Sequence, residues 1–358
     1  MRLVLVGVVA AVVGSGGNAK ADFTFGEAMD LGPPFNSPVG DEGLTVSTDG
    51  LSIFFGSCRP HGGEWDIWTC TRETTEDEWS PAMNLGPIVN TPQSEGYPSI
   101  SADGLELFFC SIYWQSQRPG GYGGADLWVT KRASADDDWN EPENLGPVVN
   151  STNHDSEPHI SSDGLSLYFA SERPGGYGPC NLYVTKRKTK DDPWEEPVNL
   201  GPTVNLGSAG TPNLSADGLL LFFTSNRSNG YGKADIWLSR RMTTSDPWGE
   251  PINLGPSINN SASQVVSYVP PDGKTLYFRV NKPQYDFMQA PILPIVDLNA
   301  DGIVDAVDLC IMVDSWGTEN PLCDIGPMPW GDGVVDVQDL IVLAEHLFED
   351  LPGRPIQP

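Results

Sequence analysis

The chain has 358 residues, 39% of them hydrophobic, and its 48 Asp and Glu outnumber 20 Lys and Arg, for a formal net charge of −28. This composition excludes wholesale disorder and suits one large β domain or two smaller domains, with many tight turns from 39 Gly and 32 Pro. The acidity excludes nucleic-acid binding and disfavours anionic membrane surfaces, because phosphate groups would be repelled.

Residues 1–21 have the pattern of a secretory signal peptide. A basic start at Arg2 precedes an apolar run, and Ala19-Lys20-Ala21 forms an A-x-A cleavage site. The apolar run is shorter than the ~20 residues that a membrane-spanning helix needs. We therefore expect cleavage near Ala21, export to the periplasm, cell surface or medium, and no membrane span.

Residues 22–290 contain an internal repeat of 54 to 60 residues, measured between the leucines of successive Asn/Asp-Leu-Gly-Pro motifs. Each unit has an Asp-Gly turn, a hydrophobic strand, an Arg or Lys, a Gly-rich turn and a second strand. The leucines of the motif are Leu31, Leu85, Leu145, Leu200 and Leu254. About four short strands per unit predict one propeller blade, so five units predict an all-β, five-bladed propeller.

The register of the repeat also predicts how the ring closes. Phe25 stands six residues before Leu31, as Trp79 stands before Leu85, whereas the last unit lacks a Trp segment of its own. We expect segment 24–32 to supply the outer strand of blade five, which removes an open sheet edge. The repeated Trp residues are expected to form core between blades, and each Arg to pair with an acid of its own blade.

The unit Pro-x-Ile-Ser-x-Asp-Gly-x-x-Leu-Tyr-Phe-x-Ser-x-Arg, read at Pro158–Arg173, resembles the WD40-like repeat of TolB-type β-propellers. The resemblance covers about residues 24–290. It implies a secreted or periplasmic binding scaffold without a particular chemistry. Blade five departs most, with Pro270-Pro271 before its turn and Lys282 in place of Arg.

Acids precede the first strand of blades one to three and are absent from blades four and five. Because that strand lines the channel of a propeller, these carboxylates are predicted to converge at one mouth. They suit a glycoside hydrolase, in which paired acids act as proton donor and as base or nucleophile. The alternative is that each acid is the structural partner of its Arg. The catalytic candidates are Glu42, Glu95 and Glu157.

Blade two is longer than the others because of an insertion near Tyr113 and Trp114. Adjacent aromatic side chains on a loop are typical of interaction sites, so they are candidates for stacking on a sugar or a protein partner. The turn tyrosines Tyr122, Tyr177 and Tyr231 would extend that face. The alternative is that Tyr113 and Trp114 fold back over a neighbouring blade.

From Asp297 the pattern changes to a twelve-residue loop of the EF-hand type. Ca²⁺ prefers six to eight oxygen ligands, which loop positions 1, 3, 5, 7, 9 and 12 provide. Gly302 stands at position six, where the chain turns sharply, and a helix is predicted to follow. The six predicted ligands are Asp297, Asn299, Asp301, Ile303 through its carbonyl, Asp305 and Asp308.

A second loop carries Asp332, Asp336 and Asp339 but has Met328 and Trp330 at its first and third positions. Asp324, from a longer loop, is the predicted replacement. Two tandem loop–helix units with Asp at position twelve resemble a type I dockerin module over about residues 295–350. The resemblance implies a Ca²⁺ cofactor and a protein receptor, either cohesin-like or another.

An exported chain permits disulfides, and Cys310 and Cys323, which flank the first predicted helix, are placed to form one. The other four cysteines are expected to be buried free thiols.

The sequence thus predicts a signal peptide (1–21), a propeller (22–290), a linker (291–296), a small α-helical dockerin-like calcium domain (297–350) and a tail (351–358). The leading interpretation is an exported, non-enzymatic binding scaffold with a glycan or protein ligand, anchored through its calcium module. The alternative is a carbohydrate-active enzyme of polysaccharide catabolism, delivered by its dockerin.

Overall fold

The computed structural model describes residues 23–60, 65–112, 118–281, 285–294, 296–298, 303–318, 323–326 and 334–347. The predicted signal peptide lies outside these ranges, as do Tyr113, Trp114, Asn299, Asp301 and Asp332. The described chain forms two compact units, of which the larger comprises Glu27–Pro271 and Thr275–Ala290. No helix within the described ranges combines the length and hydropathy that a bilayer-spanning segment requires.

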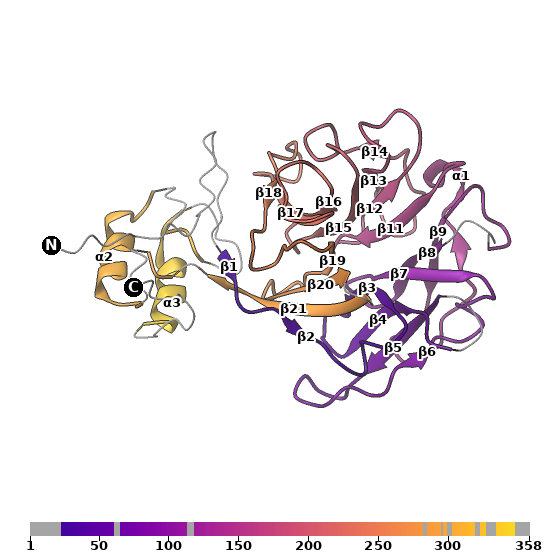
Figure 1. The fold of residues 1–358 in the computed structure, drawn as a ribbon, viewed down its shortest axis with the longest axis horizontal. Coiled ribbons are helices and arrows are strands. Elements are labelled where there is room, and N and C mark those ends of the chain that lie inside the picture. Colours follow the sequence, from indigo (N-terminus) through magenta and orange to yellow (C-terminus); the bar gives the residue numbers. More distant parts are fainter. Residues whose placement is uncertain are drawn as a thin grey trace. The chain divides into compact units, whose positions relative to one another are not determined.

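The larger unit is a five-bladed β-propeller, as predicted, and its sheets follow one another in chain order (Figure 1). Each sheet is an antiparallel meander with the first strand innermost. The inner strands contact each other in a closed ring, β3 to β7, β11, β15, β19 and back to β3. The strands, blade by blade, are β3 (Asp41–Val46), β4 (Ser52–Ser57), β5 (Asp66–Thr71), β6 (Met83–Asn84); β7 (Ser94–Ile100), β8 (Glu106–Ile112), β9 (Leu127–Lys131), β10 (Glu143–Asn144); β11 (Asp155–Ile160), β12 (Ser166–Ser171), β13 (Asn181–Lys186), β14 (Val198–Asn199); β15 (Ala209–Leu214), β16 (Leu220–Ser225), β17 (Asp235–Arg240), β18 (Ile252–Asn253); β19 (Gln264–Tyr268), β20 (Thr275–Asn281), β21 (Tyr285–Pro294).

The outer strand of blade five comes from the N-terminal part of the chain. β2 (Met29–Asp30) pairs with β21, with Met29 opposite Gln289. The closing strand is therefore shorter than the predicted segment 24–32. β1 (Phe23–Phe25) instead pairs with the last residues of β21, Phe23 lying opposite Pro294. That pairing keeps the chain extended to Pro294, within the predicted linker 291–296.

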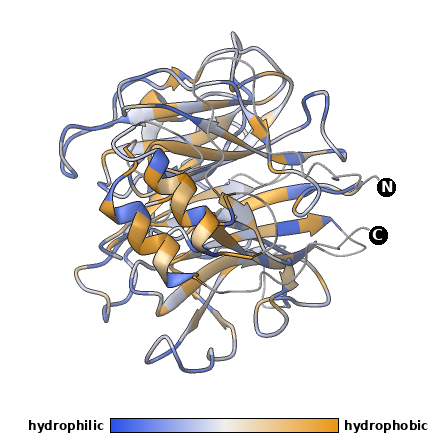
Figure 2. Ribbon diagram, turned by 90° about the vertical axis from the view of Figure 1, so that its left-hand side faces the viewer, coloured by the Kyte–Doolittle hydropathy of each residue, from blue (hydrophilic) through white to orange (hydrophobic). Residues whose placement is uncertain are grey.

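The Asp-Gly turns join the first two strands of each blade, as the sequence indicates. In blade one, Asp49 accepts hydrogen bonds from the backbone N–H of Leu51 (2.9 Å) and the hydroxyl of Ser47 (2.6 Å). Gly50 adopts a φ of +70°, which favours glycine. The strands that follow are mainly hydrophobic and the connecting loops mainly hydrophilic (Figure 2). Phenylalanines of the second strands, such as Phe55 and Phe109, are fully buried.

The repeated tryptophans lie between blades, which confirms their predicted role. The ring of Trp139 in blade two packs edge-on against Phe54 of blade one, with centroids 6.1 Å apart. Trp194 of blade three packs in the same way against Phe108 of blade two, at 6.0 Å. A second arginine series, absent from the sequence predictions, covers these rings. Arg72, Arg132, Arg187 and Arg241 lie 4.2 to 4.5 Å from the centroids of Trp79, Trp139, Trp194 and Trp248.

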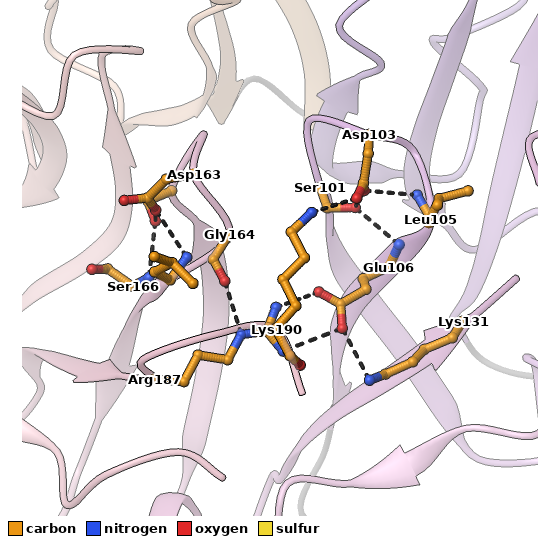
Figure 3. Close-up of polar contacts among 12 residues, drawn as sticks. Ser101, Asp103, Leu105, Glu106, Lys131, Asp163, Gly164, Ser166, Arg187 and Lys190 are labelled. Atoms are coloured by element: carbon orange, nitrogen blue, oxygen red, sulfur yellow. Dashed lines mark hydrogen bonds and ion pairs between the residues drawn. The ribbon is translucent and has the colours of Figure 1, made fainter. Parts of the chain in front are cut away.

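A buried ion pair joins blades two and three (Figure 3). The carboxylate of Glu106 accepts hydrogen bonds from both terminal nitrogens of Arg187 and lies 3.1 Å from the ammonium of Lys131. Nearby, Lys190 of blade three pairs with Asp103 of blade two, but both side chains are substantially exposed. Residues at the position of Glu106 in the other blades carry no charge: Ser52, Ser166, Leu220 and Thr275.

The smaller unit contains α2 (Ala306–Asp314) and α3 (Val337–Glu345). Each helix begins directly after an aspartate that caps it. Asp305 accepts the N–H of Val307 (2.7 Å), and Asp308 accepts the N–H of Asp305 (2.9 Å). At α3, Asp336 accepts the N–H of Gln338 (2.8 Å), and Asp339 accepts the N–H of Asp336 (2.7 Å). A shared core includes Val304, Met312, Ile325, Val335 and Leu343. A further short helix, α1 (Gly146–Val149), lies in the propeller.

Candidate functional site

The inner strands bulge close to where they begin. At the third or fourth residue the register with the second strand shifts in every blade. There Gly43, Tyr97, Glu157 and Thr211 adopt left-handed backbone angles, with φ of +57°, +50°, +56° and +45°. For residues with a side chain this conformation is strained, most of all for a β-branched threonine. The strain is concentrated where the inner strands of blades two to four face the channel.

The acids of the inner strands fall into two groups, and one group is structural. In blades one to three, a fully buried carboxylate faces the arginine that follows the second strand of its own blade. Asp41 pairs with Arg59 (3.4 Å), Glu95 with Arg118 (3.2 Å) and Asp155 with Arg173 (2.7 Å). These pairs confirm the predicted arginine–acid pairing for those blades. In blade four the acid is replaced by Ala209, and Arg227 keeps its bonds to the carbonyls of Thr203 and Val204, which match those of Arg118 and Arg173 to Val89 and Val149.

Glu95 belongs to this structural group and not to a shared catalytic mouth. Its two oxygens accept hydrogen bonds from the backbone N–H (2.9 Å) and hydroxyl (2.5 Å) of Thr91. Burial raises the pKa of Glu95 to about 7, even though Thr91 and Arg118 oppose the rise. The prediction that Glu42, Glu95 and Glu157 converge is therefore wrong for Glu95. Its side chain is fully buried beneath Arg118.

The second group, Glu42 and Glu157, gathers with Arg279 at the end of the channel where the inner strands begin. Glu42 pairs with Arg279 of blade five at 3.1 Å, and Glu157 accepts the N–H of Thr211 at 2.6 Å. Burial raises the pKa of both carboxyl groups, while the Arg279 charge opposes the rise. One buried oxygen of Glu42 has no hydrogen-bond partner among the described residues. Glu42 is thus ion-paired with a guanidinium whose charge also acts on Glu157.

Arg279 was missed by the sequence predictions, although the repeat contains the signal. Arg279 lies on β20, opposite Val265 of β19. At the same position, the second strands of the other four blades have Gly56, Cys110, Ala170 and Thr224. A charge at a position that is otherwise small and uncharged marks a break in the repeat. A comparison of the blades position by position would have selected it.

The channel offers little room beside these groups. A cavity of about 20 Å³ lies among the inner strands, lined by Tyr97, Glu157, His159, Thr211 and Asn213 with their neighbours. A second cavity of about 20 Å³ also borders His159. Each volume suits about one water molecule and no sugar ring. His159 is buried, accepts the N–H of Leu214 (3.1 Å), and has a pKa lowered by burial to about 3.

The candidate calcium ligands lie in two equivalent settings in the smaller unit. Asp308 accepts the N–H of Leu298 (2.7 Å), and Asp339 accepts those of Ile325 (2.5 Å) and Gly326 (2.7 Å). The residues just before Leu298 and Ile325 are Asp297 and Asp324. Asp324 therefore occupies in the second loop the place of Asp297 in the first. The second loop is longer by four residues, since 339 − 325 exceeds 308 − 298 by four.

The donor set fits a hard cation. Asp297, Asp308, Asp324 and Asp339 are each at most 3% exposed. Burial raises the pKa of Asp339, although three backbone N–H groups oppose the rise. Residues 297–347 include no Lys or Arg. Within the described ranges no three acidic, His or Cys side chains lie close enough to hold a metal. Asn299, Asp301 and Asp332 fall outside those ranges.

No disulfide joins any two of the six cysteines, all of which lie in the described ranges. Cys310 is exposed on α2, while Cys323 is buried with its sulfur 3.4 Å from the hydroxyl of Ser315. The predicted disulfide between them is therefore wrong. Cys58, Cys70, Cys110 and Cys180 form no disulfide either. Cys70 and Cys110 are buried as expected, whereas Cys58 and Cys180 are only partly buried.

Comparisons with known proteins find only remote structural similarity. No known family and no curated protein matches the sequence. Among solved structures, TolB from Acinetobacter baumannii matches 72% of this chain with 15% identity and a TM-score of 0.43, and the chain spans about half of it (55%). α-L-Arabinofuranosidases from Podospora anserina and Lactobacillus brevis match at 12% and 14% identity, covering 76% and 72% of this chain and 97% and 92% of theirs, with TM-scores of 0.47.

Proposed function

We propose that this protein is an exported binding scaffold, whose propeller recognises a ligand and whose C-terminal unit binds calcium and a protein receptor. The observation that carries the calcium part is the burial of four aspartates in a stretch without Lys or Arg. Of the 48 acids in the chain, 13 fall within residues 297–358. A bound divalent cation would compensate that charge and complete the core of a unit too small to bury much apolar surface.

The calcium ligands of the first loop are Asp297, Asn299, Asp301, Asp305 and Asp308, with the carbonyl of Ile303. Those of the second are Asp324, Asp332, Asp336 and Asp339. Ca²⁺ would supply charge neutralisation and fix the start of each helix. The chain's own contribution is to hold the last carboxylate of each loop in place through backbone N–H donors. This geometry supports a second site built around Asp324.

The helices of the smaller unit also present apolar side chains to solvent. Val307 and Val313 on α2 are 50% and 54% exposed, and Val337 and Ile341 on α3 are 55% and 54% exposed. Figure 2 shows hydrophobic residues along both helices. Exposed apolar side chains on a calcium-organised helix pair favour docking to a protein receptor, cohesin-like or another.

Calorimetry on the full chain tests the calcium part. We expect wild type to bind Ca²⁺ with a Kd of ~10⁻³ M or tighter, and its thermal unfolding to shift upward. Asp308→Ala and Asp339→Ala should each remove about one bound ion, because each deletes the last ligand of one loop. Asp314→Ala, which removes an exposed acid of the same helix, is the control. Absence of heat and of any unfolding shift at millimolar calcium contradicts the proposal.

The enzymatic alternative stays a prediction without specific support. Glu42 and Glu157 are close enough for the charge of Glu157 to raise the pKa of Glu42, and a glycosidase requires two neighbouring carboxyl groups. However, the adjacent cavity has room for a water molecule but not for a sugar ring. Glu95 is ion-paired with Arg118 instead of facing that cavity. The described residues therefore favour recognition over hydrolysis.

A further inference from the structure

Three tyrosines occupy the same turn in three consecutive blades. Tyr122, Tyr177 and Tyr231 each stand four residues after the arginine that follows the second strand, in the middle of Gly-Tyr-Gly. Their exposed fractions are 51%, 58% and 53%. Other aromatic side chains that the repeat keeps, such as Trp139 and Trp248, are buried between blades. We call these three side chains the tyrosine arc.

The backbone of each turn is fixed, so the rings are presented from a rigid support. The N–H of Tyr122 donates to Asp126 (2.6 Å) and that of Tyr177 to Asn181 (2.7 Å). Tyr231 donates in the same way to Asp235. Asp126, Asn181 and Asp235 are at most 1% exposed. A rigid turn lowers the entropy lost when a ligand orders the ring.

The flanking glycines cannot carry side chains. A Cβ on Gly121 or Gly176 would lie 2.4 Å from the side chain of Asp126 or Asn181. A Cβ on Gly178 would lie 1.6 Å from the carbonyl oxygen of Gly207 in the loop that leads into blade four. Packing therefore accounts for both glycines of the motif. It does not account for a large aromatic side chain between them that stays half in solvent.

The three turns lie at the same end of their sheets. Strands alternate in direction within a blade, so every turn between second and third strands emerges where the inner strands begin. Each turn also rests on the loop leading into the next blade, as when Gly124 donates to the carbonyl of Asn153 (3.1 Å). Consecutive blades are neighbours in the ring, and the tyrosines are thus repeated one blade apart on one face.

We propose that the tyrosine arc binds a neutral polysaccharide, each ring stacking on the C–H face of a sugar. Tyrosine suits this partner because it combines an apolar ring with a polar hydroxyl. Exposed residues in and beside these turns include the polar Thr152, Ser228 and Asn229, together with the charged Glu172 and Lys233. They offer hydrogen bonds to sugar hydroxyls. The net charge of −28 disfavours polyanionic chains.

A polymer is favoured over a folded protein partner because the arc repeats the same group in the same setting. A polysaccharide offers the same sugar face many times, so weak contacts add through one chain. This inference rests on the proposed role of the propeller as a binding module. It does not depend on the calcium unit.

Affinity electrophoresis of the full chain in gels containing xylan, mixed-linkage glucan, glucomannan or polygalacturonate tests the proposal. We expect retardation by at least one neutral polysaccharide, not by polygalacturonate, and equally with calcium or with EDTA. Tyr177→Ala should lower the association constant about tenfold. The triple variant Tyr122→Ala/Tyr177→Ala/Tyr231→Ala should abolish retardation. Unfolding should change little, because the rings are half-exposed.

Met242→Ala is the matched control, because Met242 is 71% exposed and lies after a third strand, at the opposite end of the sheets. Retardation that survives in the triple variant overturns the proposal. So does a wild type that none of the neutral polysaccharides retards. Because calcium binding is measured separately on the same protein, either result is distinguishable from failure of the calcium unit.

Discussion

At the corner of blade two, Glu95 accepts two hydrogen bonds from Thr91 and one from Arg118, whereas blade five places Gln264 at the same position. Gln264 keeps the backbone bond, accepting the N–H of Asn260 at 3.0 Å. At this position, near the start of the inner strand, the blade thus requires a hydrogen-bond acceptor more than it requires a charge. Where the charge is present, burial opposes it, and the pKa of Glu95 rises to about 7.

Glu95→Gln should therefore reduce the pH dependence of stability. A carboxyl whose pKa rises from about 4.5 in the unfolded chain to about 7 in the folded one favours folding fully below pH 4.5. That contribution, about 3 kcal/mol, is lost as the pH rises through 7. Urea unfolding at pH 5 and pH 8 should show a smaller loss of stability for the variant than for wild type. An equal loss in both proteins contradicts this account.

At the scale of single residues, the sequence predicted which side chains form ion pairs within a blade, but not which residues meet across the closed ring. The arginine–acid pairs of blades one to three follow from the repeat, because both partners recur at fixed places. The environment of Glu42 does not, because Arg279 is 237 residues away in sequence and reaches it only through closure of the ring. The left-handed angles of Tyr97, Glu157 and Thr211 have no local signal, since glycine occupies the position only in blade one.

Between neighbouring elements, a buried ion pair between Glu106 and Arg187 joins blade two to blade three (Figure 3). Burial alone would raise the pKa of Glu106, but hydrogen bonds from Arg187 and Lys131 lower it. Arg187 is 6% exposed and also donates to the carbonyls of Gly164 and Lys190. Removing the carboxylate would leave a buried guanidinium only partly compensated.

Glu106→Ser, which installs the residue of blades one and three, should destabilise the protein by about 2–4 kcal/mol. Lys190→Ala breaks the exposed pair with Asp103 and should cost less than about 1 kcal/mol. Chemical unfolding of both variants at one pH measures the difference. Similar losses in the two variants would show that the buried pair has no special role in joining the blades.

The elements themselves were largely predictable. Asp-Gly turns and alternating apolar residues place the first three strands of each blade, because those signals are local. The outer strands are only two residues long, and the helices begin at Asp-capped positions that hydrophobic periodicity does not mark. The disulfide between Cys310 and Cys323 failed for a spatial reason, since one sulfur faces solvent and the other the core.

At the scale of the whole molecule, the loop that follows each outer strand carries an asparagine whose side chain bonds to the backbone of the third strand. We call this pair of hydrogen bonds the asparagine clamp. Asn205 accepts the N–H of Leu182 (2.7 Å) and donates to its carbonyl (3.0 Å). Asn36 makes the same two bonds to Phe287, at 2.7 and 2.9 Å. Asn205 and Leu182 are 23 residues apart in sequence, whereas Asn36 and Phe287 are 251 residues apart. The sequence predicted that the ring closes at this place, but not that Asn36 clamps it.

Asn36→Ala and Asn205→Ala remove equivalent bonds, so both should lower the free energy of unfolding by about 1–3 kcal/mol. Their local consequences should differ. In blade three the chain is continuous across the Asn205 clamp, whereas in blade five only non-covalent contacts hold β2 against β21. Releasing β2 regains the entropy of a long loop and exposes the edge of β21. Limited proteolysis under native conditions should therefore cut the Asn36→Ala variant near residues 27–36 several times faster than wild type. Asn205→Ala should leave that segment protected, and equal cleavage in both variants would mean that ring closure does not depend on this clamp.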